Sequence, residues 1–482
     1  MLPSPDICER ARISRDPRFD GRFFIGVLTT GIYCRPVCPA RMPARDNVRF
    51  YASAAAAEDA GYRPCRRCRP ETAARVPEWS IRSRTVVRGL RLIDGGQVDE
   101  AGVAGMASRL GLSARHLNRL FMEELGASPK SLAMARRRAL AKRLLDDTDL
   151  PLAQVALQAG YRSLRRFNDD LLRFYHRSPG ALRAARRAGA GTDGAAIRLA
   201  VREPYDAAWV FGFLAKRALA GFEQVDGLCY RRRVQDDAGN DHWICVRWRD
   251  GALHLEVPPA CGVPLSELLP RVRRLFDLDA DAAVIGRHLA ADPLLAPVVV
   301  QHPGLRVPGA WDGFETAVRA VLGQQVSVAR ATVLAQALLD RFGAHVLQSP
   351  RELAGADVAA VGMPGRRGEA IRLLAAAAAE GRLDLSDGAD ADALQAALCA
   401  LPGIGPWTAG YVAMRVARDP DAFPVDDWVV TRVLANAEAD AVPRGRAQAR
   451  RMEPWRPWRA YAVMYLWKLA ELRRAAAQKE AS

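Results

Sequence analysis

Four cysteines near the start of the chain constrain its fold more than any other feature. Cys34 and Cys38 form one close pair, Cys65 and Cys68 form a second, and residues 39–64 separate the two pairs. Two such pairs are typical of a tetrahedral zinc site with four thiolate ligands. We therefore expect a small zinc-bound α/β domain over residues 1–77.

Arginines crowd the same stretch of sequence. They are Arg35, Arg41, Arg45, Arg49, Arg63, Arg66, Arg67 and Arg69. A metal-thiolate centre surrounded by guanidinium groups indicates a nearby phosphate and a sulfur that stays ionised and nucleophilic. The spacing of the cysteines alone also fits the alternative, a structural zinc knuckle without such chemistry.

The net charge is concentrated in the first part of the chain. Of the total of +16, residues 1–78 carry +5, residues 79–190 carry +11 and residues 191–482 carry none. This asymmetry indicates a polyanionic partner, most simply double-stranded DNA. No apolar run reaches the ~18 residues that span a membrane, and no signal peptide is evident. We expect a cytoplasmic, nucleoid-associated protein with no membrane partner.

The 482 residues are too many for one core, so we expect several domains. The pattern predicts a multidomain, mainly helical protein with α+β parts. After the zinc domain, with a strand over 23–30, we expect a helical domain over 79–186 and a small-residue linker over 186–197. A mixed α/β subdomain should follow over 198–280, with a hairpin across 249–251, and then a helical domain over 281–474.

The helical domain contains two similar helix-turn-helix units, at 103–121 and 152–167. In each unit a Gly ends the first helix and a Ser can cap the second. Outward positions on the second helices should meet bases and phosphates; they are Arg115, His116, Asn118 and Arg119, then Arg162, Arg165, Arg166 and Asn168. With the motif at 175–179, residues 81–185 resemble the AraC-type DNA-binding domain. The resemblance implies operator binding, gene activation and RNA polymerase as a partner.

Residues 29–41, 47–51 and 61–68 resemble the Ada-type methyl-phosphotriester acceptor domain. The resemblance implies that Cys34 irreversibly accepts one methyl group from a methylated DNA phosphate, while Cys38, Cys65 and Cys68 also hold one Zn²⁺. Among the arginines, Arg35 and Arg41 are our candidates for contact with DNA. A second acceptor motif, Pro-Cys-His-Arg, is absent from the sequence.

The stretch 401–409 reads Leu-Pro-Gly-Ile-Gly-Pro-Trp-Thr-Ala, which is typical of a helix-hairpin-helix. Gly403 and Gly405 would let backbone groups approach a DNA phosphate or a bound monovalent cation, with a helix N-terminus behind them. The alternative is an ordinary Gly-rich helical turn. About twenty residues later, Asp426 and Asp427 follow, at the distance that base-excision glycosylases use.

Residues 202–470 resemble AlkA-type 3-methyladenine DNA glycosylases. The matching segments are 205–218, 274–278, 303–309, 320–329, 362–364, 401–409 and 455–461. The resemblance implies an aromatic pocket of Trp407, Tyr411 and Trp467 for cationic purines such as 3-methyladenine and 7-methylguanine. Core packing is the alternative for any one of these aromatic residues.

Asp427 is the candidate catalytic carboxylate, which would stabilise the positive charge that develops on the sugar and assist water. A helix N-cap is the alternative role for either Asp. Bifunctional hairpin glycosylases carry a nucleophilic Lys where this chain has Trp407, so we expect a monofunctional enzyme. Gln325 stands at the DNA-wedging position, which is often apolar in the family. The competing hypothesis for the whole chain is a regulator whose C-terminal half grips DNA without excising bases.

Overall fold

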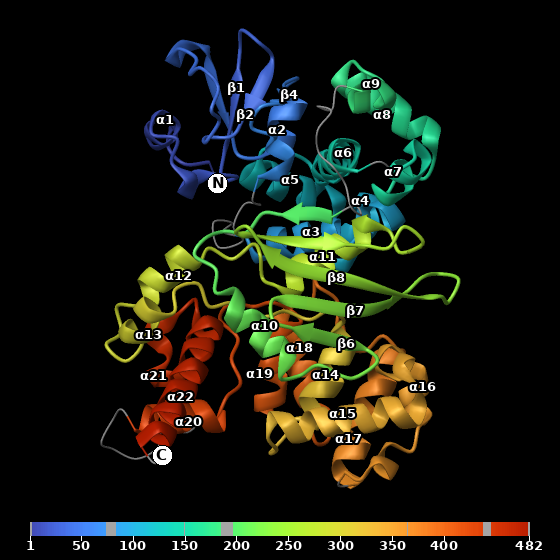
Figure 1. The fold of residues 1–482 in the computed structure, drawn as a ribbon, viewed down its shortest axis with the longest axis vertical. Helices are drawn as coiled ribbons and strands as arrows, with labels where there is room; N and C mark the ends of the chain where they lie inside the picture. The colour runs from blue at the N-terminus through green and yellow to red at the C-terminus, as the bar shows by residue number, and fades with distance from the viewer. Residues whose placement is uncertain are drawn as a thin grey trace. The chain divides into compact units, whose positions relative to one another are not determined.

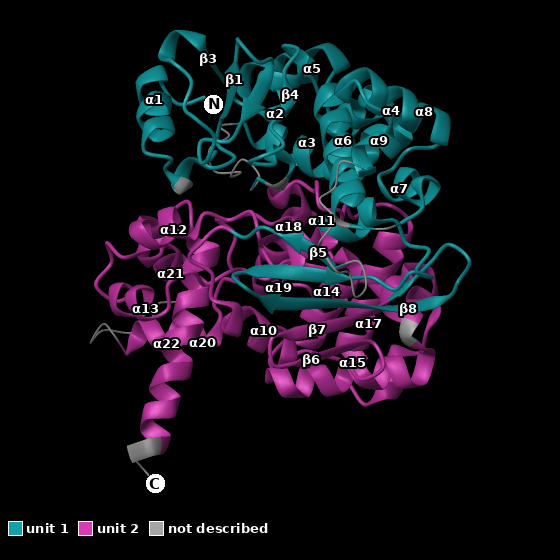
Figure 2. Ribbon diagram, turned by 45° about the horizontal axis from the view of Figure 1, so that its top comes forward, with its two compact units in different colours: residues 1–201, 234–270 teal, residues 202–233, 271–482 magenta. Residues whose placement is uncertain are grey.

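The computed structural model describes residues 2–73, 83–148, 150–184, 196–363, 365–436 and 445–480. The chain divides into two compact units, residues 1–201 with 234–270 and residues 202–233 with 271–482 (Figure 2). The mainly helical fold with small sheets is confirmed (Figure 1). Most of the predicted linker, residues 185–195, lies outside the described residues. No helix in the described parts of the chain is long and apolar enough to cross a membrane.

The first unit begins with a four-stranded sheet in the order β3-β1-β2-β4. The strand predicted over 23–30 is present as β1 but is shorter, because it ends at Val27 and residues 28–30 form a turn. β2 pairs antiparallel with β1 and parallel with β4, and this parallel register sets Tyr33 beside Pro64. The cysteine that follows each of these residues is thereby brought to one end of the sheet. The elements here are α1 (Pro5–Ile13), η1 (Pro17–Phe19), β1 (Phe24–Val27), β2 (Ile32–Cys34), η2 (Arg45–Asn47), β3 (Val48–Tyr51), α2 (Ala54–Asp59), β4 (Arg63–Pro64) and η3 (Pro70–Thr72).

Within the described residues 83–148 and 150–184, seven helices follow in the same unit, and they contain both predicted helix-turn-helix pairs. They are α3 (Arg84–Asp94), α4 (Gln97–Arg109, kinked at Gly102), α5 (Ala114–Leu125), α6 (Pro129–Asp147), α7 (Leu152–Gln158), α8 (Leu164–Tyr175) and α9 (Pro179–Ala184). The turn glycines, Gly111 and Gly160, have φ of +70° and +84°, a conformation that Gly adopts without strain. Ser113 and Ser163 cap α5 and α8 through their side chains, as predicted.

Helix α2 of the cysteine-bearing part packs into the core of these helices. Ala55 and Ala56 belong to the same buried cluster as Phe121 and Leu125 of α5. The hydroxyl of Ser53, which caps α2, donates to the carbonyl of Leu125 at the end of α5 (2.9 Å). Five residues after Ser53, Glu58 accepts a hydrogen bond from Arg138 of α6 (2.6 Å). Helix α2 therefore shares one core with the helices α3–α6, while the buried residues of the sheet form separate clusters.

The first unit also contains an antiparallel sheet segment in the order β5-β9-β8, formed by β5 (Ala196–Leu199), β8 (Asp241–Arg249) and β9 (Ala252–Glu256). The predicted hairpin across 249–251 is confirmed, because Arg249 pairs with Ala252 and the two turn residues, Asp250 and Gly251, both have positive φ. Two elements run across the division between the units, β7 (Cys229–Gln235) and α11 (Leu265–Leu275).

The second unit is mostly helical, as predicted for the C-terminal part. Its elements are α10 (Ala207–Ala215), β6 (Glu223–Asp226), α12 (Ala282–Leu289), α13 (Ala296–Gln301), α14 (Gly313–Leu322), α15 (Val328–Phe342), η5 (Ala344–Gln348), α16 (Pro350–Gly355), η6 (Val358–Val361), α17 (Gly365–Ala379), α18 (Ala391–Cys399), α19 (Pro406–Arg415), α20 (Trp428–Ala435), α21 (Arg446–Arg451), η7 (Glu453–Trp455) and α22 (Arg459–Glu480). Its core is tied together by buried ion pairs, among them those of Arg232 with Glu223 and Glu315.

Candidate functional sites

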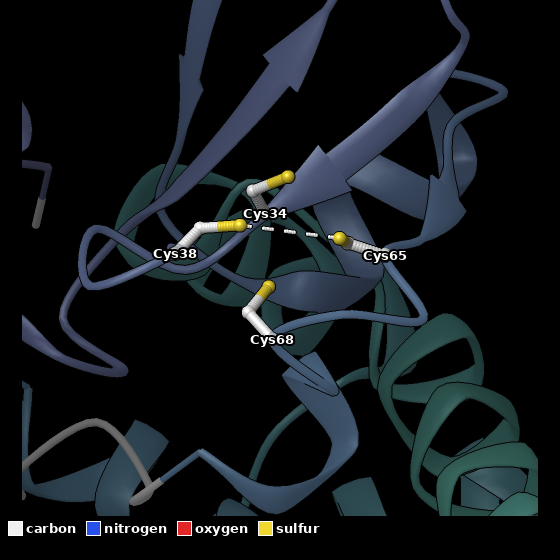
Figure 3. Close-up of side chains that lie close together, drawn as sticks. All are labelled: Cys34, Cys38, Cys65 and Cys68. Atoms are coloured by element: carbon white, nitrogen blue, oxygen red, sulfur yellow. Dashed lines mark hydrogen bonds between the residues drawn. The ribbon is translucent and has the colours of Figure 1, made fainter. Parts of the chain in front are cut away.

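The four predicted metal ligands meet at one end of the first sheet (Figure 3). The sulfur atoms of Cys34, Cys38, Cys65 and Cys68 all lie within 4.8 Å of one another, and those of Cys38 and Cys65 are 4.0 Å apart. A tetrahedral zinc ion with Zn–S bonds of about 2.3 Å needs S–S separations of about 3.8 Å. The donor set and its geometry therefore fit one Zn²⁺. Cys65 and Cys68 are buried, whereas Cys34 and Cys38 are only partly buried.

The arginine next to the first ligand is already engaged within the domain. Arg35 pairs with the carboxylate of Asp20, and its guanidinium also donates to the carbonyl oxygen of Cys68 (3.1 Å). These contacts brace the metal centre, and a role for Arg35 in DNA binding stays a prediction. Arg41, the other candidate, is exposed.

The two predicted reading helices present their basic residues to solvent. On α5, Arg115 and Arg119 are exposed and Asn118 is partly exposed, while Leu117 and Phe121 are buried beneath them. On α8 and the turn before it, the exposed side chains include those of Arg162, Arg165, Arg166 and Asn168. Both helices thus have the buried and exposed faces that the sequence predicts, and contact with bases stays a prediction.

The predicted hairpin joins α18 to α19, and α19 packs closely against the segment that leads to the two acids. Gly403 in this hairpin has a φ of +83°. A Cβ atom on Gly410 of α19 would lie 2.2 Å from the carbonyl oxygen of Phe423, so only Gly permits this approach. As a result, Trp407 at the start of α19 comes within hydrogen-bonding distance of Asp427.

Asp427 sits between two indole rings. Its Oδ2 accepts from Nε1 of Trp407 (3.0 Å) and its Oδ1 from Nε1 of Trp467 on α22 (3.1 Å). Oδ1 also accepts from the backbone N–H groups of Val429 (3.1 Å) and Val430 (3.0 Å), so Asp427 is the N-cap of α20. The residue is buried, with 7% of its surface exposed. Both interpretations of this residue, N-cap and site carboxylate, are therefore compatible with its geometry.

The third predicted pocket residue, Tyr411, lies one turn after Trp407 on α19. The two rings are nearly parallel, with an interplanar angle of 9° and centroids 5.6 Å apart. The hydroxyl of Tyr411 accepts from Arg415 (2.9 Å), whose guanidinium also donates to the carbonyl oxygens of Pro308 and Gly309. Burial works in the opposite direction, but Arg415 and Arg217 hold the pKa of Tyr411 below its usual value. Arg415 was not predicted as a site residue, although it follows Tyr411 by four residues on a helix, a spacing at which side chains meet.

Two other residues singled out in the sequence, Asp426 and Gln325, have surroundings that differ from those of Asp427. Asp426 has a φ of +60°, and its Oδ1 accepts from the backbone N–H of Gly445 (2.6 Å), so it binds the N-cap residue of α21. Gln325 is exposed in the turn between α14 and α15, with a φ of +54°. Its neighbour, Gln324, reaches back to the hairpin, a contact that the sequence did not predict.

Together these features define a multidomain DNA-binding protein with a four-cysteine metal domain, paired reading helices and a helix-hairpin-helix unit. Family models match the chain in three places: the metal binding domain of Ada over residues 7–71, a helix-turn-helix domain over residues 106–185 and the AlkA N-terminal domain over residues 196–312. These matches agree with the three resemblances found in the sequence.

The chain is 42% identical over 490 residues to the probable bifunctional transcriptional activator/DNA repair enzyme AlkA of Mycobacterium tuberculosis, and the match covers 96% of each protein. It therefore belongs to this family of bifunctional, AlkA-type proteins. It is also 34% identical over 279 residues to DNA-3-methyladenine glycosylase 2 of Escherichia coli, covering 55% of this chain and 94% of that one. The bifunctional activator/repair enzyme Ada of Escherichia coli is 41% identical over 125 residues, which cover 26% of this chain and 34% of that protein.

Proposed function

We propose that this protein senses DNA alkylation at its four-cysteine domain, activates transcription, and excises alkylated purines from DNA as a monofunctional glycosylase. Family membership supports the combination. The observation that carries the catalytic half is the environment of Asp427. In the described chain its four hydrogen bonds come from uncharged N–H donors, so no ion pair neutralises the carboxylate.

Such a carboxylate suits the cleavage of an N-glycosidic bond. As the bond between the purine and the sugar breaks, its electron pair leaves with the base and positive charge develops on the sugar. Asp427 would stabilise that charge and accept a proton from the attacking water. The faces of Trp407, Tyr411 and Trp467 would favour a cationic purine over a neutral one. With Trp407 at the lysine position of bifunctional enzymes, no Schiff base would form, and an abasic site would be the product.

At the other end of the chain, the sulfur of Cys34 would take a methyl group from a phosphotriester. A bond forms between sulfur and the methyl carbon, the bond between that carbon and the phosphate oxygen breaks, and an ordinary phosphodiester anion is restored. Bound zinc would keep the sulfur ionised at neutral pH. Methylation removes one negative charge; at ~4 Å from a phosphate and an effective dielectric of ~20 the gross Coulomb energy is about 4 kcal/mol, before screening by salt. Operator DNA would then bind more tightly.

We further propose a role for Gln325, a cation at the hairpin and a protein partner. Gln325 would fill the space left by the extruded nucleotide, and the hairpin 401–405 would hold a monovalent cation through backbone carbonyl oxygens. The carbonyl oxygen of Gly403 accepts from Gln324 and has a second lone pair, so it can still contact a cation. RNA polymerase would be the partner of the activator bound at its operator.

The zinc-loaded full-length protein should be incubated with methylated duplex DNA, and both the protein mass and the released bases should be measured. We expect the mass to increase by one methyl group and methylated purines to be released. Cys34→Ser should abolish methyl uptake and leave base release unchanged, because the two sites are chemically independent. Methyl uptake without base release would favour a regulator that only grips DNA, and base release without methyl uptake would favour a structural zinc domain.

A further inference from the structure

The turn that carries Gln325 is held to the hairpin by its neighbour, Gln324. The side-chain amide of Gln324 donates to the carbonyl oxygen of Gly403 (3.0 Å) and to the hydroxyl oxygen of Thr408 (2.9 Å). A primary amide has two N–H groups, and these two contacts use both of them. The acceptors lie about eighty residues further along the chain, so this contact joins two distant segments of the same unit.

The backbone of Gln324 is fixed as well. Its carbonyl oxygen accepts from the guanidinium of Arg367 on α17 (2.6 Å). The turn is therefore attached to the hairpin through the side chain of Gln324 and to α17 through its backbone. These attachments immediately precede a residue with unusual geometry.

Gln325 has a φ of +54° and an exposed side chain. Residues other than Gly seldom adopt this conformation, and it persists where the surrounding structure holds it. In this turn the contacts of Gln324 supply that restraint. They leave the side chain of Gln325 projecting from the turn into solvent.

We propose that Gln324 is a positioning residue that sets Gln325 at a fixed place relative to Asp427. The connection runs from Gln325 through Gln324 to Thr408, then to the adjacent Trp407, whose indole donates to Asp427. This inference rests on the proposed function, because it assigns the turn a part in extruding the damaged nucleotide. A base can be cleaved only when it has left the stack, so the group that fills the gap and the carboxylate that acts on the sugar must be correctly spaced.

The test compares duplex with single-stranded substrate. A duplex requires the wedge to unstack the lesion, whereas a single strand presents an unpaired base that needs little unstacking. We expect Gln324→Ala and Gln324→Glu to slow release of methylated purines from a duplex by about tenfold to a hundredfold, the range that small misplacements cause. Release from a single strand of the same sequence should change by less than about twofold. Gln324→Glu keeps the size of the side chain but removes both N–H donors.

Three further variants serve as controls for this comparison. Gln336→Ala on α15 serves as the matched control, because the amide of Gln336 also donates to a backbone carbonyl, that of Ala220, but lies outside the turn. It should leave the duplex-to-single-strand ratio unchanged. Gln325→Ala should slow release from the duplex as much as Gln324→Ala does. The double variant should release bases no more slowly than either single variant, since both changes remove the same wedge function. Fluorescence of 2-aminopurine beside the lesion should report the same loss of unstacking.

Equal slowing on both substrates would overturn the assignment, because Gln324 would then act on the hairpin or the chemistry. Unchanged release from the duplex would overturn it too. If the unmodified protein releases no base from either substrate, the proposed glycosylase function itself fails, and this result is distinguishable from failure of the positioning role alone.

Discussion

Replacing Asp427 by Asn tests whether the carboxylate between the two indoles carries the glycosylase chemistry. The oxygen of Asn can occupy the place of Oδ1 and keep the hydrogen bonds from Trp467, Val429 and Val430, so the cap of α20 survives. The amide NH₂ then faces Nε1 of Trp407, and two donors meet where a hydrogen bond of 3.0 Å existed. Losing that bond should reduce the free energy of unfolding by about 1–3 kcal/mol.

The loss in catalysis should be larger, since the negative charge itself disappears. Removal of a group that stabilises developing charge typically lowers the rate by about 10²–10³-fold, equivalent to about 2.7–4 kcal/mol. We expect a decrease of at least this size in the single-turnover rate of methylated-purine release, measured by chromatography with protein in excess. Affinity for the methylated duplex, measured by fluorescence anisotropy, should change by less than about threefold, because an uncharged side chain of the same shape remains in place.

Asp426→Asn is the matched control. It removes the neighbouring carboxylate, but the remaining oxygen can still accept from Gly445, and Asn tolerates the positive φ at this position. Its rate should stay within about twofold of the unmodified protein. The assignment of Asp427 is refuted if Asp427→Asn releases bases at the original rate, or if both variants lose the same amount of activity.

Three other predictions concern the metal, a buried ion pair and a buried acid. Removing zinc with a chelator should unfold the four-cysteine domain and make its thiols reactive toward a thiol reagent, because metal binding and folding are coupled; protection that survives the chelator would contradict this. Glu58→Ala should destabilise the first unit by about 3 kcal/mol, since it leaves the guanidinium of Arg138 buried with a poorer partner. A double variant with Arg138→Met should recover most of that loss in urea unfolding monitored by zinc release, and failure to recover would refute the argument. Burial raises the pKa of Asp277 to about 6, above the ~3.9 of an unfolded Asp. The folded state therefore binds this proton more tightly, and stability should fall as pH rises from about 4 to about 6 and level off above. Asp277→Asn should remove that part of the slope, and a difference from the unmodified protein that does not vary with pH would disprove it.

The features predicted correctly from the sequence are those that short-range chemistry determines. The four cysteines converge because each pair is local and only one parallel strand contact, Tyr33 beside Pro64, must join the pairs. The helix-turn-helix units follow from apolar spacing, a turn Gly and a capping Ser, and all three lie within about twenty residues. The hairpin between α18 and α19 is likewise a local event.

The contacts that the sequence did not predict depend on long-range packing. Nothing near Asp427 in the chain reveals that Trp407 and Trp467, one on each side in sequence, would donate to its two oxygens. The same holds for Arg35, whose charge indicated a phosphate partner but whose guanidinium pairs with Asp20. A polar side chain with several possible partners binds the carboxylate or carbonyl group that the fold brings near it. Hydrophobic periodicity in the sequence does not reveal which partner that will be.

The seating of α2 among the helices that follow it has a consequence for dissection of this protein. Ala55, Ala56 and the Ser53 cap complete a core that otherwise belongs to α3, α4, α5 and α6. In a fragment that starts at residue 83, the apolar surface that Ala55 and Ala56 cover would be exposed to water. The carbonyl oxygen of Leu125 would also lose its hydrogen bond from the Ser53 hydroxyl. The four-cysteine part of the chain is therefore also a structural component of the helix-turn-helix part. Removing either part should destabilise the other.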